Sequence, residues 1–500
     1  MNSVPHRQVV VVGGGISGLV TAWRLKNAGV DVMLLEAQPT VGGCMQSEKR
    51  DGFILEKGPF NVLVCDDAFH DLLADCSADV APVRASDDAG ARYVLKGGRL
   101  LKVPMGLGAL LRTPLLSGRA KIRLLRGMIL SARAEKDEPT IAEAAQRRLG
   151  AEVADTFISS IVAGIFGGDS RRLSLKACFP KAWRFDQQRR SPLAYEIGVL
   201  RAKKKQARER PDRQAHKGLI SFRGGLQSLA DWLADQLGAD LIASCRVESI
   251  TPVADGYTLT CSGNDRPRDI CCRHLVLATP KDVTAGLLRP MEPVASQTLD
   301  AIESASLVVL NLGYRREDVG HPMSGYGFLV PAGEREVPVM GVLWADSAFP
   351  HHGPDDRRLI RVFMGGARDP QAATRTDEEL LRIAAGALNG LLDITGEPVL
   401  VDICRWPASI PQYHLGHTQR IERLLEAIRP LGNLHLVGNY LRGVSINDCV
   451  REGTHMAEMI ISRLGDQTED TSHNDASEEL AATAPEMARH PDPFPDRLSA

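Results

Sequence analysis

The chain has 500 residues, of which 44% are hydrophobic and 24% are charged, an ordinary globular composition. Its 60 basic and 62 acidic residues give a net charge of −2, and only 5% of the residues are aromatic. These values exclude a strongly basic nucleic-acid-binding protein and disfavour a base-stacking surface. No apolar run reaches the roughly 18 residues of a membrane-spanning helix. The ten cysteines lack metal-ligand spacing, so we expect reduced thiols, no bound metal and a cytoplasmic protein.

The N-terminus predicts a strand–helix–strand unit. Residues 8–13 are mostly valines and indicate a buried strand, and apolar residues follow at helical spacing over 16–29. Residues 30–37 indicate a second buried strand. Such a unit within the first 40 residues is typical of the start of a dinucleotide-binding domain.

The turn between the first strand and the helix carries the G-x-G-x-x-G pattern at Gly13, Gly15 and Gly18. The first glycine permits a tight turn, the second lets the backbone approach a diphosphate, and the third lets helix and strand pack closely. The diphosphate is then expected at the helix N-terminus. Glu36, at the end of the second strand, is expected to accept hydrogen bonds from the adenosine ribose.

The rest of the chain predicts a mixed α/β protein. The expected elements are helices over 141–168, short strands over 241–280, strands at 305–313, 325–331, 337–345 and 358–364, a helix over 377–392, and a strand–loop–helix from 433. We expect a Rossmann-like domain made from 8–90, 215–290 and 400–465, an interleaved substrate-binding sheet domain from 291–399, and a helical region from 91–214 at the substrate mouth. A disordered acidic tail is expected over 466–500.

Two segments carry a resemblance to the FAD-containing amine oxidase superfamily: a second glycine turn with a following D-G-F…E-x-G-P run over 42–59, and the strand–loop–helix G-N-Y-L-R-G-V-S-I-N-D over 438–448. Within that superfamily the chain is similar to the protoporphyrinogen oxidase family over nearly all of residues 8–465. The similar segments are 145–155, 158–181, 220–234, 406–417 and 438–453.

The resemblance implies FAD as the cofactor. The residues that would contact it are Gly13, Gly14, Gly15, Ile16, Ser17, Gly18, Glu36, Ala37, Cys44, Lys57, Gly58, Pro59, Phe60, Val247, Trp406, Ile446, Asn447 and Asp448. Two of these have plain structural alternatives. Val247 could be an ordinary strand residue, and Asp448 could simply cap the last helix.

The resemblance also implies the reaction, which is the six-electron oxidation of protoporphyrinogen IX to protoporphyrin IX with dioxygen, or alternatively a quinone, as acceptor. The flavin supplies the chemistry, so no catalytic acid–base residue is expected. Arg92 is expected to bind a substrate propionate, and Leu329 and Val342 to enclose the macrocycle. A surface role for Arg92 and core packing for the other two are the alternatives. Phe166 and Phe363 are weaker candidates.

Residues 99–134 hold eight basic residues and no acidic one, interleaved with apolar side chains. Such a segment suits contact with anionic lipids, so peripheral attachment to the cytoplasmic membrane is one expectation. A helix pair with a basic solvent face is the alternative. A homodimer is also left open.

Other activities remain as alternatives at this point. Coproporphyrinogen III, with four carboxylates, is an alternative substrate for the same chemistry. An amine oxidase or a carotenoid-type desaturase would share the fold, and a flavoprotein that only binds porphyrin or lipid would share the cofactor. An amine oxidase typically has Gly-Glu where this chain has Gly438-Asn439.

Overall fold

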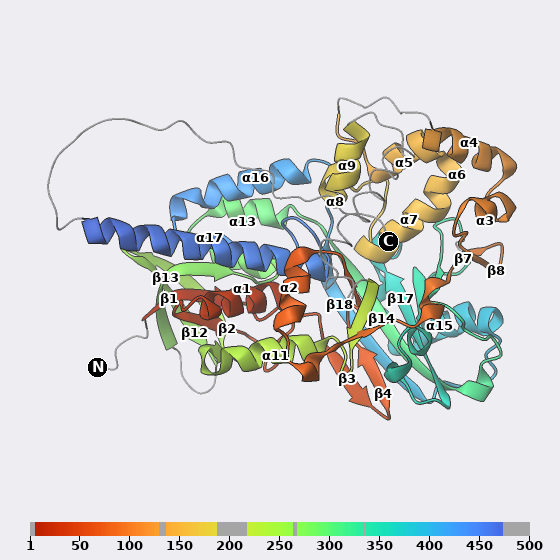
Figure 1. Ribbon diagram of the computed structural model, residues 1–500, viewed down its shortest axis with the longest axis horizontal. Helices are drawn as coiled ribbons and strands as arrows, with labels where there is room; N and C mark the ends of the chain where they lie inside the picture. Colours follow the sequence, from red (N-terminus) through yellow and green to blue (C-terminus); the bar gives the residue numbers. More distant parts are fainter. Residues whose placement is uncertain (1–5, 130–136, 188–217, 264–267, 335, 474–500) are drawn as a thin grey trace.

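The computed structural model describes residues 6–129, 137–187, 218–263, 268–334 and 336–473. Two seven-stranded sheets organise these residues, and Figure 1 shows the first sheet with its helices on the left and the second sheet on the right. Segments far apart in the sequence build each sheet, so the chain passes between the two halves several times.

The first sheet is the dinucleotide-binding type that the N-terminus predicts. Its parallel part brings β1, β2 and β13 side by side, with Val12 opposite both Leu35 and Leu277. Two antiparallel strands extend it on the far side of β13. The path runs β10 (Leu241–Ile242), β2 (Val32–Leu35), β1 (His6–Val12), β13 (Arg268–Leu277), β12 (Gly256–Ser262) and β11 (Arg246–Val253), with β19 (Leu434–Leu436) also paired to β13.

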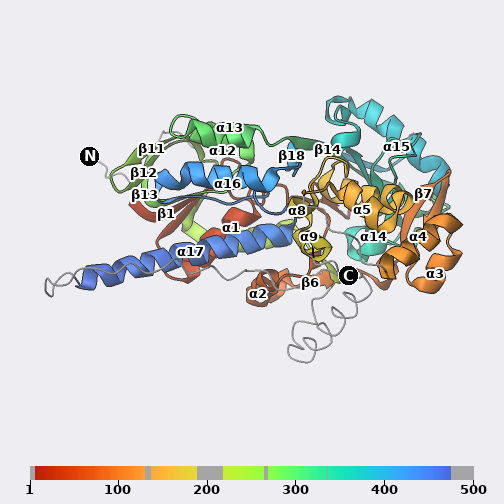
Figure 2. The same ribbon diagram turned by 90° about the horizontal axis from the view of Figure 1, so that it is seen from above.

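Helices cover both faces of the first sheet (Figure 2). The valines of β1 alternate between two cores, because successive strand residues point to opposite faces. Val9 and Val11 pack with helices on one face, whereas Val10 and Val12 belong to the core on the other. The first face is covered by α1 (Ile16–Asn27), α2 (Asp67–Asp75), α11 (Gln227–Leu237) and α17 (Ile446–His473), and the second by α12 (Lys281–Leu288), α13 (Pro293–Asp300) and α16 (His417–Ile428).

The second sheet carries α15 (Asp377–Leu392) on one face, with a continuous apolar core between them. A Thr376–Glu379 capping box starts this helix. The path of the sheet is β18 (Leu400–Pro411), β14 (Ser304–Arg315), β17 (Arg357–Gly365), β16 (Gly341–Trp344), β15 (Gly327–Leu329), β7 (Arg92–Lys96) and β8 (Arg99–Lys102). Small strands join the two halves: β3 (Ser47–Arg50), β4 (Phe53–Glu56), β5 (Val62–Val64), β6 (Pro82–Arg84) and β9 (Gly218–Phe222).

A group of helices lies beside the second sheet, at the upper right in Figure 1. Asp186 holds part of this group together, because its buried carboxylate bonds both Arg147 at 2.8 Å and Arg148 at 2.5 Å. The group consists of α3 (Leu107–Arg112), α4 (Gly118–Ile129), α5 (Ile141–Leu149), α6 (Ala151–Val153), α7 (Ser159–Phe166), α8 (Leu175–Cys178) and α9 (Pro180–Gln187).

Three of the expected boundaries are wrong. Residues 92–102, which the sequence placed in the helical region, form two strands of the second sheet. Residues 400–411, placed with the Rossmann-like part, form the edge strand β18 of the second sheet. Residues 466–473, expected in the disordered tail, continue α17, and the rest of that tail lies outside the described residues, as does the basic run 201–217. The first two errors arise because these strands pair with distant segments of the chain. The third arises because α17 extends beyond its apolar pattern.

Within the part of the chain that the structure describes, no helix is both long and apolar enough to cross a membrane. The same residues contain no cluster of three or more His, Cys, Asp or Glu side chains suited to a metal ion.

Buried neutral histidines make the fold sensitive to acid. His274 and His435 stack between β13 and β19, and burial lowers their pKa values to about 4 and about 3. The unfolded chain therefore binds protons near pH 6.5, whereas the folded chain does not bind them until the pH is much lower. Stability is consequently lost as the pH falls from 6.5 toward 4. A depression of two units in one imidazole corresponds to about 3 kcal/mol. We expect the free energy of unfolding, measured by urea denaturation, to fall between pH 7 and 5.

The matched variants are His435→Gln and His455→Gln, since His455 is exposed on α17. The buried replacement should flatten the pH dependence of the unfolding free energy, whereas the exposed one should leave it unchanged. A wild-type unfolding free energy that stays constant from pH 7 to 5 would contradict this account.

Candidate functional site

The glycine turn between β1 and α1 has the geometry of a diphosphate cradle. Gly13 has a φ of +109°, and a Cβ atom there would lie 2.7 Å from the Ala278 carbonyl oxygen. A Cβ at Gly18 would overlap the Gly13 carbonyl oxygen. Gly15 differs from both, because a Cβ there meets nothing within 4 Å. Gly15 is also the N-cap of α1 and supplies no capping side chain, so the helix presents its first N–H groups to an anion.

The second glycine turn lies directly against the first. The Gly42 amide donates to the Gly14 carbonyl at 2.8 Å, and Gly15 and Gly42 form a parallel bridge. A Cβ at Gly43 would lie 3.4 Å from the Gly15 Cα. The two turns therefore form one wall of glycine backbone. A side chain on this wall would reduce the space in front of it.

Glu36 stabilises this wall. Its Oε2 accepts a hydrogen bond from the Gly14 amide at 2.6 Å, and its Oε1 accepts one from the Gln38 amide at 2.7 Å. Each carboxylate oxygen has a second acceptor position, so the arrangement is compatible with an additional ribose hydroxyl. Beside it, the Cys245 amide donates to the Glu36 carbonyl at 2.8 Å, which brings the start of β11 close to Glu36. The Val247 side chain itself belongs to the apolar core.

The turn from Lys57 to Phe60 leads from β4 toward the second sheet. A Cβ at Gly58 would overlap the Cys44 carbonyl oxygen, so this glycine packs directly on the second glycine turn. The indole N–H of Trp406, on β18, donates to the Lys57 carbonyl at 2.7 Å. The Lys57 ammonium pairs with Asp402 at 2.6 Å. The predicted residues Cys44, Lys57, Gly58 and Trp406 thus meet in space.

The sequence interpretation missed Arg361, on β17. Its guanidinium is fully buried and donates through Nη2 to the Gly58 carbonyl at 2.9 Å. The rings of Phe60 and Phe363 lie 5.0 and 5.4 Å from its central carbon. Burial lowers its pKa to about 10 and raises the pKa of nearby Glu56 to about 7. An arginine in the middle of the apolar run 359–364 was the available signal, since a buried arginine normally has a partner.

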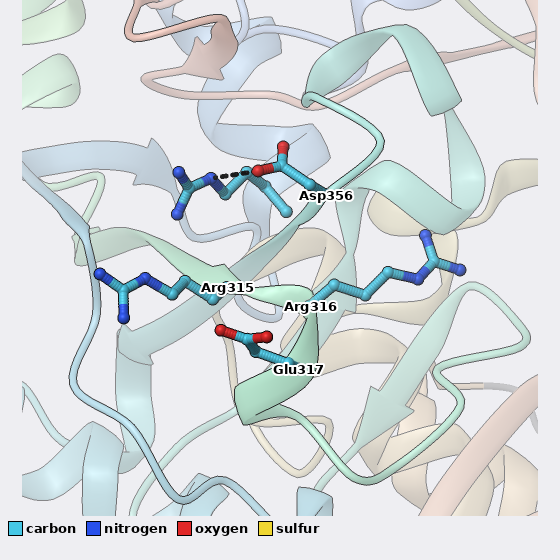
Figure 3. Close-up of a pocket in the computed structure, with 5 residues that line it drawn as sticks. Arg315, Arg316, Glu317 and Asp356 are labelled. Carbon is cyan, nitrogen blue, oxygen red and sulfur yellow. Dashed lines mark ion pairs between the residues drawn. The ribbon is translucent and has the colours of Figure 1, made fainter.

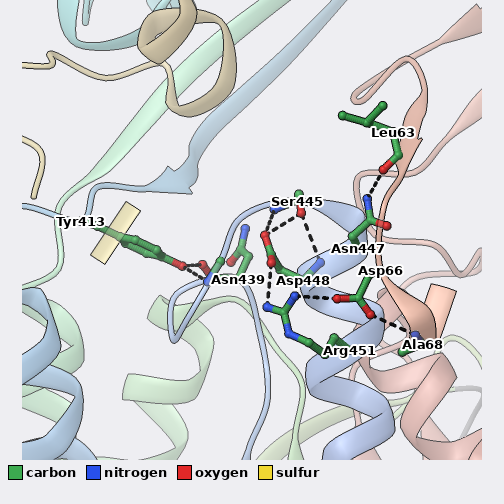
Figure 4. A network of polar contacts seen from close by, with 10 residues as sticks. Leu63, Asp66, Ala68, Tyr413, Asn439, Ser445, Asn447, Asp448 and Arg451 are labelled. Carbon is green, nitrogen blue, oxygen red and sulfur yellow. Dashed lines mark hydrogen bonds and ion pairs between the residues drawn. The ribbon is translucent and has the colours of Figure 1, made fainter. Parts of the chain in front are cut away.

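The loop before α17 forms the C-terminal side of the site, and Figure 4 shows its contacts. The Tyr413 hydroxyl accepts from the Gly443 amide at 2.8 Å and donates to the Asn439 carbonyl. Asn447 donates through Nδ2 to the Leu63 carbonyl at 2.8 Å. Its buried Oδ1 has no hydrogen-bond partner among the described residues. An orphaned acceptor at a helix N-terminus suits a bound group that donates a hydrogen bond there.

Asp448 has the role that the sequence left open as the structural alternative, which is to cap the last helix. Its Oδ2 accepts from the Ser445 amide at 3.2 Å, and the Ser445 hydroxyl accepts from the Asp448 amide at 3.2 Å. This reciprocal pair is a capping box. The Asp448 carboxylate also pairs with Arg451 at 2.7 Å, and Arg451 reaches Asp66 at 3.1 Å (Figure 4). Both oxygens of Asp448 are therefore engaged in starting α17.

We expect Asp448→Ala to lower the free energy of unfolding by about 1–2 kcal/mol, the cost of losing a cap with an ion pair. FAD affinity should change less than in Asn447→Ala, which removes the orphaned acceptor. Chemical denaturation and fluorescence titration of the apoprotein with FAD give the two values. Ser445→Ala should lower the free energy of unfolding by a similar amount. An Asp448→Ala protein of normal stability that no longer binds FAD would contradict the capping role.

The predicted substrate residues lie on different faces of the second sheet. Val342 pairs with Phe328 and is fully buried in the core under α15, so it has the core packing that the sequence left open as the alternative to a contact with the macrocycle. Leu329 pairs with Gly341 and points to the opposite face, where a Cβ on Gly164 of α7 would lie 3.5 Å from it. Leu343, the neighbour of Val342, lies on that same face because strand residues alternate.

Phe166 and Phe363, the two weaker candidates, lie in different parts of the structure. Phe363 pairs with Gly341 and therefore shares the face of Leu329. Phe166 is buried in the core of the helical group, against Phe179 and Tyr413.

Arg92 is exposed at the start of β7, and its guanidinium lies 5.6 Å from the centre of the Tyr326 ring. It pairs in register with Gly327, Gly327 with Leu343, and Leu343 with Arg361. These residues form one row across the sheet, so both arginines are on the face of Leu329.

A separate pocket of about 540 Å³ lies at the C-terminal end of β14 and the N-terminal end of β17. Figure 3 shows its charged lining, with Arg315, Arg316, Glu317 and Asp356 labelled. Asp356 pairs with Arg357 at 3.3 Å. The pocket's other lining residues are Arg315, Arg316 and Glu317. None of the predicted cofactor or substrate residues belongs to it.

Comparison with known proteins agrees with this geometry. Residues 16–461 match the family of flavin-containing amine oxidoreductases. Coproporphyrinogen III oxidase of Bacillus subtilis (strain 168) is 27% identical over 463 residues, covering 89% of this chain and 96% of that protein. The chloroplastic protoporphyrinogen oxidase of Nicotiana tabacum is 29% identical over 471 residues, covering 91% and 85%.

Solved structures share the fold of this chain. A crystal structure from Exiguobacterium sp. 255-15, which carries the name "Putative protoporphyrinogen oxidase", superposes with a TM-score of 0.77 at 24% identity, over 93% of this chain and all of that one. Putrescine oxidase bound to putrescine has a TM-score of 0.63 at 19% identity, over 92% and 100%. The fold, the paired glycine turns and the family match lead to one conclusion: the chain belongs to the flavin-containing amine oxidoreductase family and is an FAD-dependent oxidoreductase.

Proposed function

We propose that this enzyme oxidises protoporphyrinogen IX to protoporphyrin IX with dioxygen as the electron acceptor. Six electrons and six protons leave the substrate, and three dioxygen molecules are reduced to hydrogen peroxide. The observation that carries the proposal is the similarity to porphyrinogen oxidases over about nine-tenths of the chain. FAD, when bound, accepts the hydride equivalents.

The residues of this chain support that role by binding and orientation. We propose that the wall formed by Gly15, Gly42 and Gly43 holds the diphosphate, that Glu36 holds the ribose, and that Asn447 accepts a hydrogen bond from the flavin. The flavin-side face of the second sheet, with Leu329 on it, then forms an apolar wall for the macrocycle. Such a wall excludes water from the reacting carbon.

Anaerobic mixing with protoporphyrinogen IX tests the proposal. The flavin's visible absorbance should bleach rapidly, and admission of oxygen should restore it with release of hydrogen peroxide. Putrescine serves as the matched negative substrate, because putrescine oxidase shares the fold. Bleaching by the amine, with none by the porphyrinogen, would overturn the assignment. Recovery with a quinone and not with oxygen would change the acceptor alone.

Coproporphyrinogen III is the second candidate substrate, because the Bacillus subtilis relative is named for it. It carries four carboxylates, whereas protoporphyrinogen IX carries two. The same anaerobic experiment, run with equal concentrations of both porphyrinogens, ranks the two by their bleaching rates.

We also propose that α3, α4 and the strand before them rest on an anionic membrane. Met105, Leu111 and Ile122 are exposed large hydrophobic residues in a stretch rich in arginine and lysine. Each basic residue near such a surface contributes about 1 kcal/mol. Cosedimentation with anionic vesicles at low salt, lost at high salt, is expected. Absence of binding at low salt would reject the contact. Arg133, at the end of the predicted segment, lies outside the described residues.

A further inference from the structure

Three strands of the second sheet donate hydrogen bonds to three consecutive carbonyl groups, at the end of β4 and the start of the turn from Lys57 to Phe60. Asn311 on β14 donates to the Glu56 carbonyl at 3.2 Å. Trp406 on β18 donates to the Lys57 carbonyl at 2.7 Å, and Arg361 on β17 donates to the Gly58 carbonyl at 2.9 Å. The second sheet thus fixes the backbone of residues 56–58, one carbonyl group per strand.

Arg361 is the charged member of this set, and hydrogen bonds use only part of its guanidinium. Its Nε and Nη1 are buried and have no hydrogen-bond partner in the described part of the chain. Glu56 and Asp402 are the nearby acids, and neither forms an ion pair with it within 4.0 Å among the described residues. Glu56 accepts from Ser47 at 2.7 Å and from the Leu226 amide at 2.8 Å. Asp402 pairs with Lys57 and accepts from Asn311 at 2.9 Å.

A buried cation with open N–H groups favours negative charge nearby, because the dielectric screening there is weak. The flavin gains negative charge when it is reduced to its anionic two-electron form. We propose that Arg361 is a positioning residue that holds the Gly58 turn against the flavin and, through its charge, raises the reduction potential of the bound cofactor. The proposal rests on FAD binding and does not depend on which porphyrinogen is the substrate.

Arg361→Gln tests the charge while keeping a donor for the Gly58 carbonyl. The readout is the midpoint potential of the holoenzyme flavin, measured anaerobically against a reference dye without any substrate. We expect the equilibrium between reduced and oxidised flavin to shift about tenfold toward the oxidised form, which corresponds to a fall of about 30 mV for a two-electron couple. Because no porphyrinogen is present, failure here is distinguishable from failure of the proposed reaction.

Two further variants make the result decisive. Arg361→Lys retains a cation, so its potential should stay close to that of the wild type. Arg405→Gln is the matched control, since Arg405 lies on the other face of the same sheet in a partly exposed pair with Asp377. An unchanged potential in Arg361→Gln overturns the proposal. A fall in Arg361→Lys as large as that in Arg361→Gln overturns the charge effect. If Arg361→Gln does not fold, Arg361→Lys still tests the proposal by comparison with the wild type: a potential close to the wild-type value supports the charge effect, and a fall of about 30 mV overturns it.

A direct contact between Arg361 and a substrate carboxylate is the competing role. It predicts a rise in KM for the porphyrinogen in Arg361→Gln with no change in the potential of the substrate-free enzyme. That outcome would also overturn the proposal.

Discussion

Replacing Gly15 by alanine should weaken FAD binding strongly while leaving the folded apoprotein intact. The backbone of Gly15 has a φ of −69°, which alanine adopts freely, and its Cβ would meet no protein atom within 4 Å. The added methyl group instead enters the space in which the diphosphate has to approach the backbone. We expect FAD affinity to fall about a hundredfold, or roughly 2.8 kcal/mol. Urea denaturation of the apoprotein should change by less than about 1 kcal/mol.

Gly18→Ala should behave differently, although it lies only one turn further along α1. Its Cβ would overlap the Gly13 carbonyl and lie 3.0 Å from the Ala278 side chain, so helix and sheet have to separate. We expect the apoprotein itself to lose about 3 kcal/mol of stability.

Gly286→Ala, on α12, is the matched control for Gly15→Ala, because its Cβ also meets nothing within 4 Å. It should bind FAD normally. If Gly15→Ala binds FAD as the wild type does, the diphosphate does not lie on this wall.

The local part of the site could be predicted from the sequence because its signals are local. The three glycines, the strand before them and the helix after them occupy one short stretch of chain, and the structure shows a separate steric reason for Gly13 and Gly18. The helix over 377–392 was equally accessible, since a capping box and apolar spacing both lie within it. In these places one short stretch of sequence contains all the residues that determine the local structure.

The second sheet could be predicted only in part, because its strands come from distant segments. Strand residues alternate between faces, so an error of one residue moves a side chain to the wrong side of the sheet. Val342 and Leu343 illustrate this, since only the pairing of β16 with β15 and β17 shows that Leu343, and not Val342, shares a face of the sheet with Arg361. Arg361 depends on the same information. Its contact with Gly58 joins residues 303 positions apart.

The largest effect expected on substrate binding concerns Arg92. Its guanidinium is exposed, lies over the Tyr326 ring, and is on the same face of the sheet as Leu343 and Arg361. A propionate bound there would form a charge-assisted hydrogen bond, which solvent screening at an exposed site weakens. We expect Arg92→Gln to raise the KM for protoporphyrinogen IX about tenfold, equivalent to roughly 1.4 kcal/mol, with little change in kcat. Steady-state kinetics with peroxide detection provides both constants.

Salt dependence and a neighbouring arginine separate a specific contact from a general basic surface. Raising the ionic strength should increase the wild-type KM and affect Arg92→Gln much less, because the variant has already lost the screened interaction. Arg99, exposed on the adjacent strand β8, is the matched control. Arg99→Gln should leave the KM nearly unchanged. If both variants raise the KM equally, the substrate responds to the summed positive charge of this edge, and Arg92 has no particular role in binding the propionate.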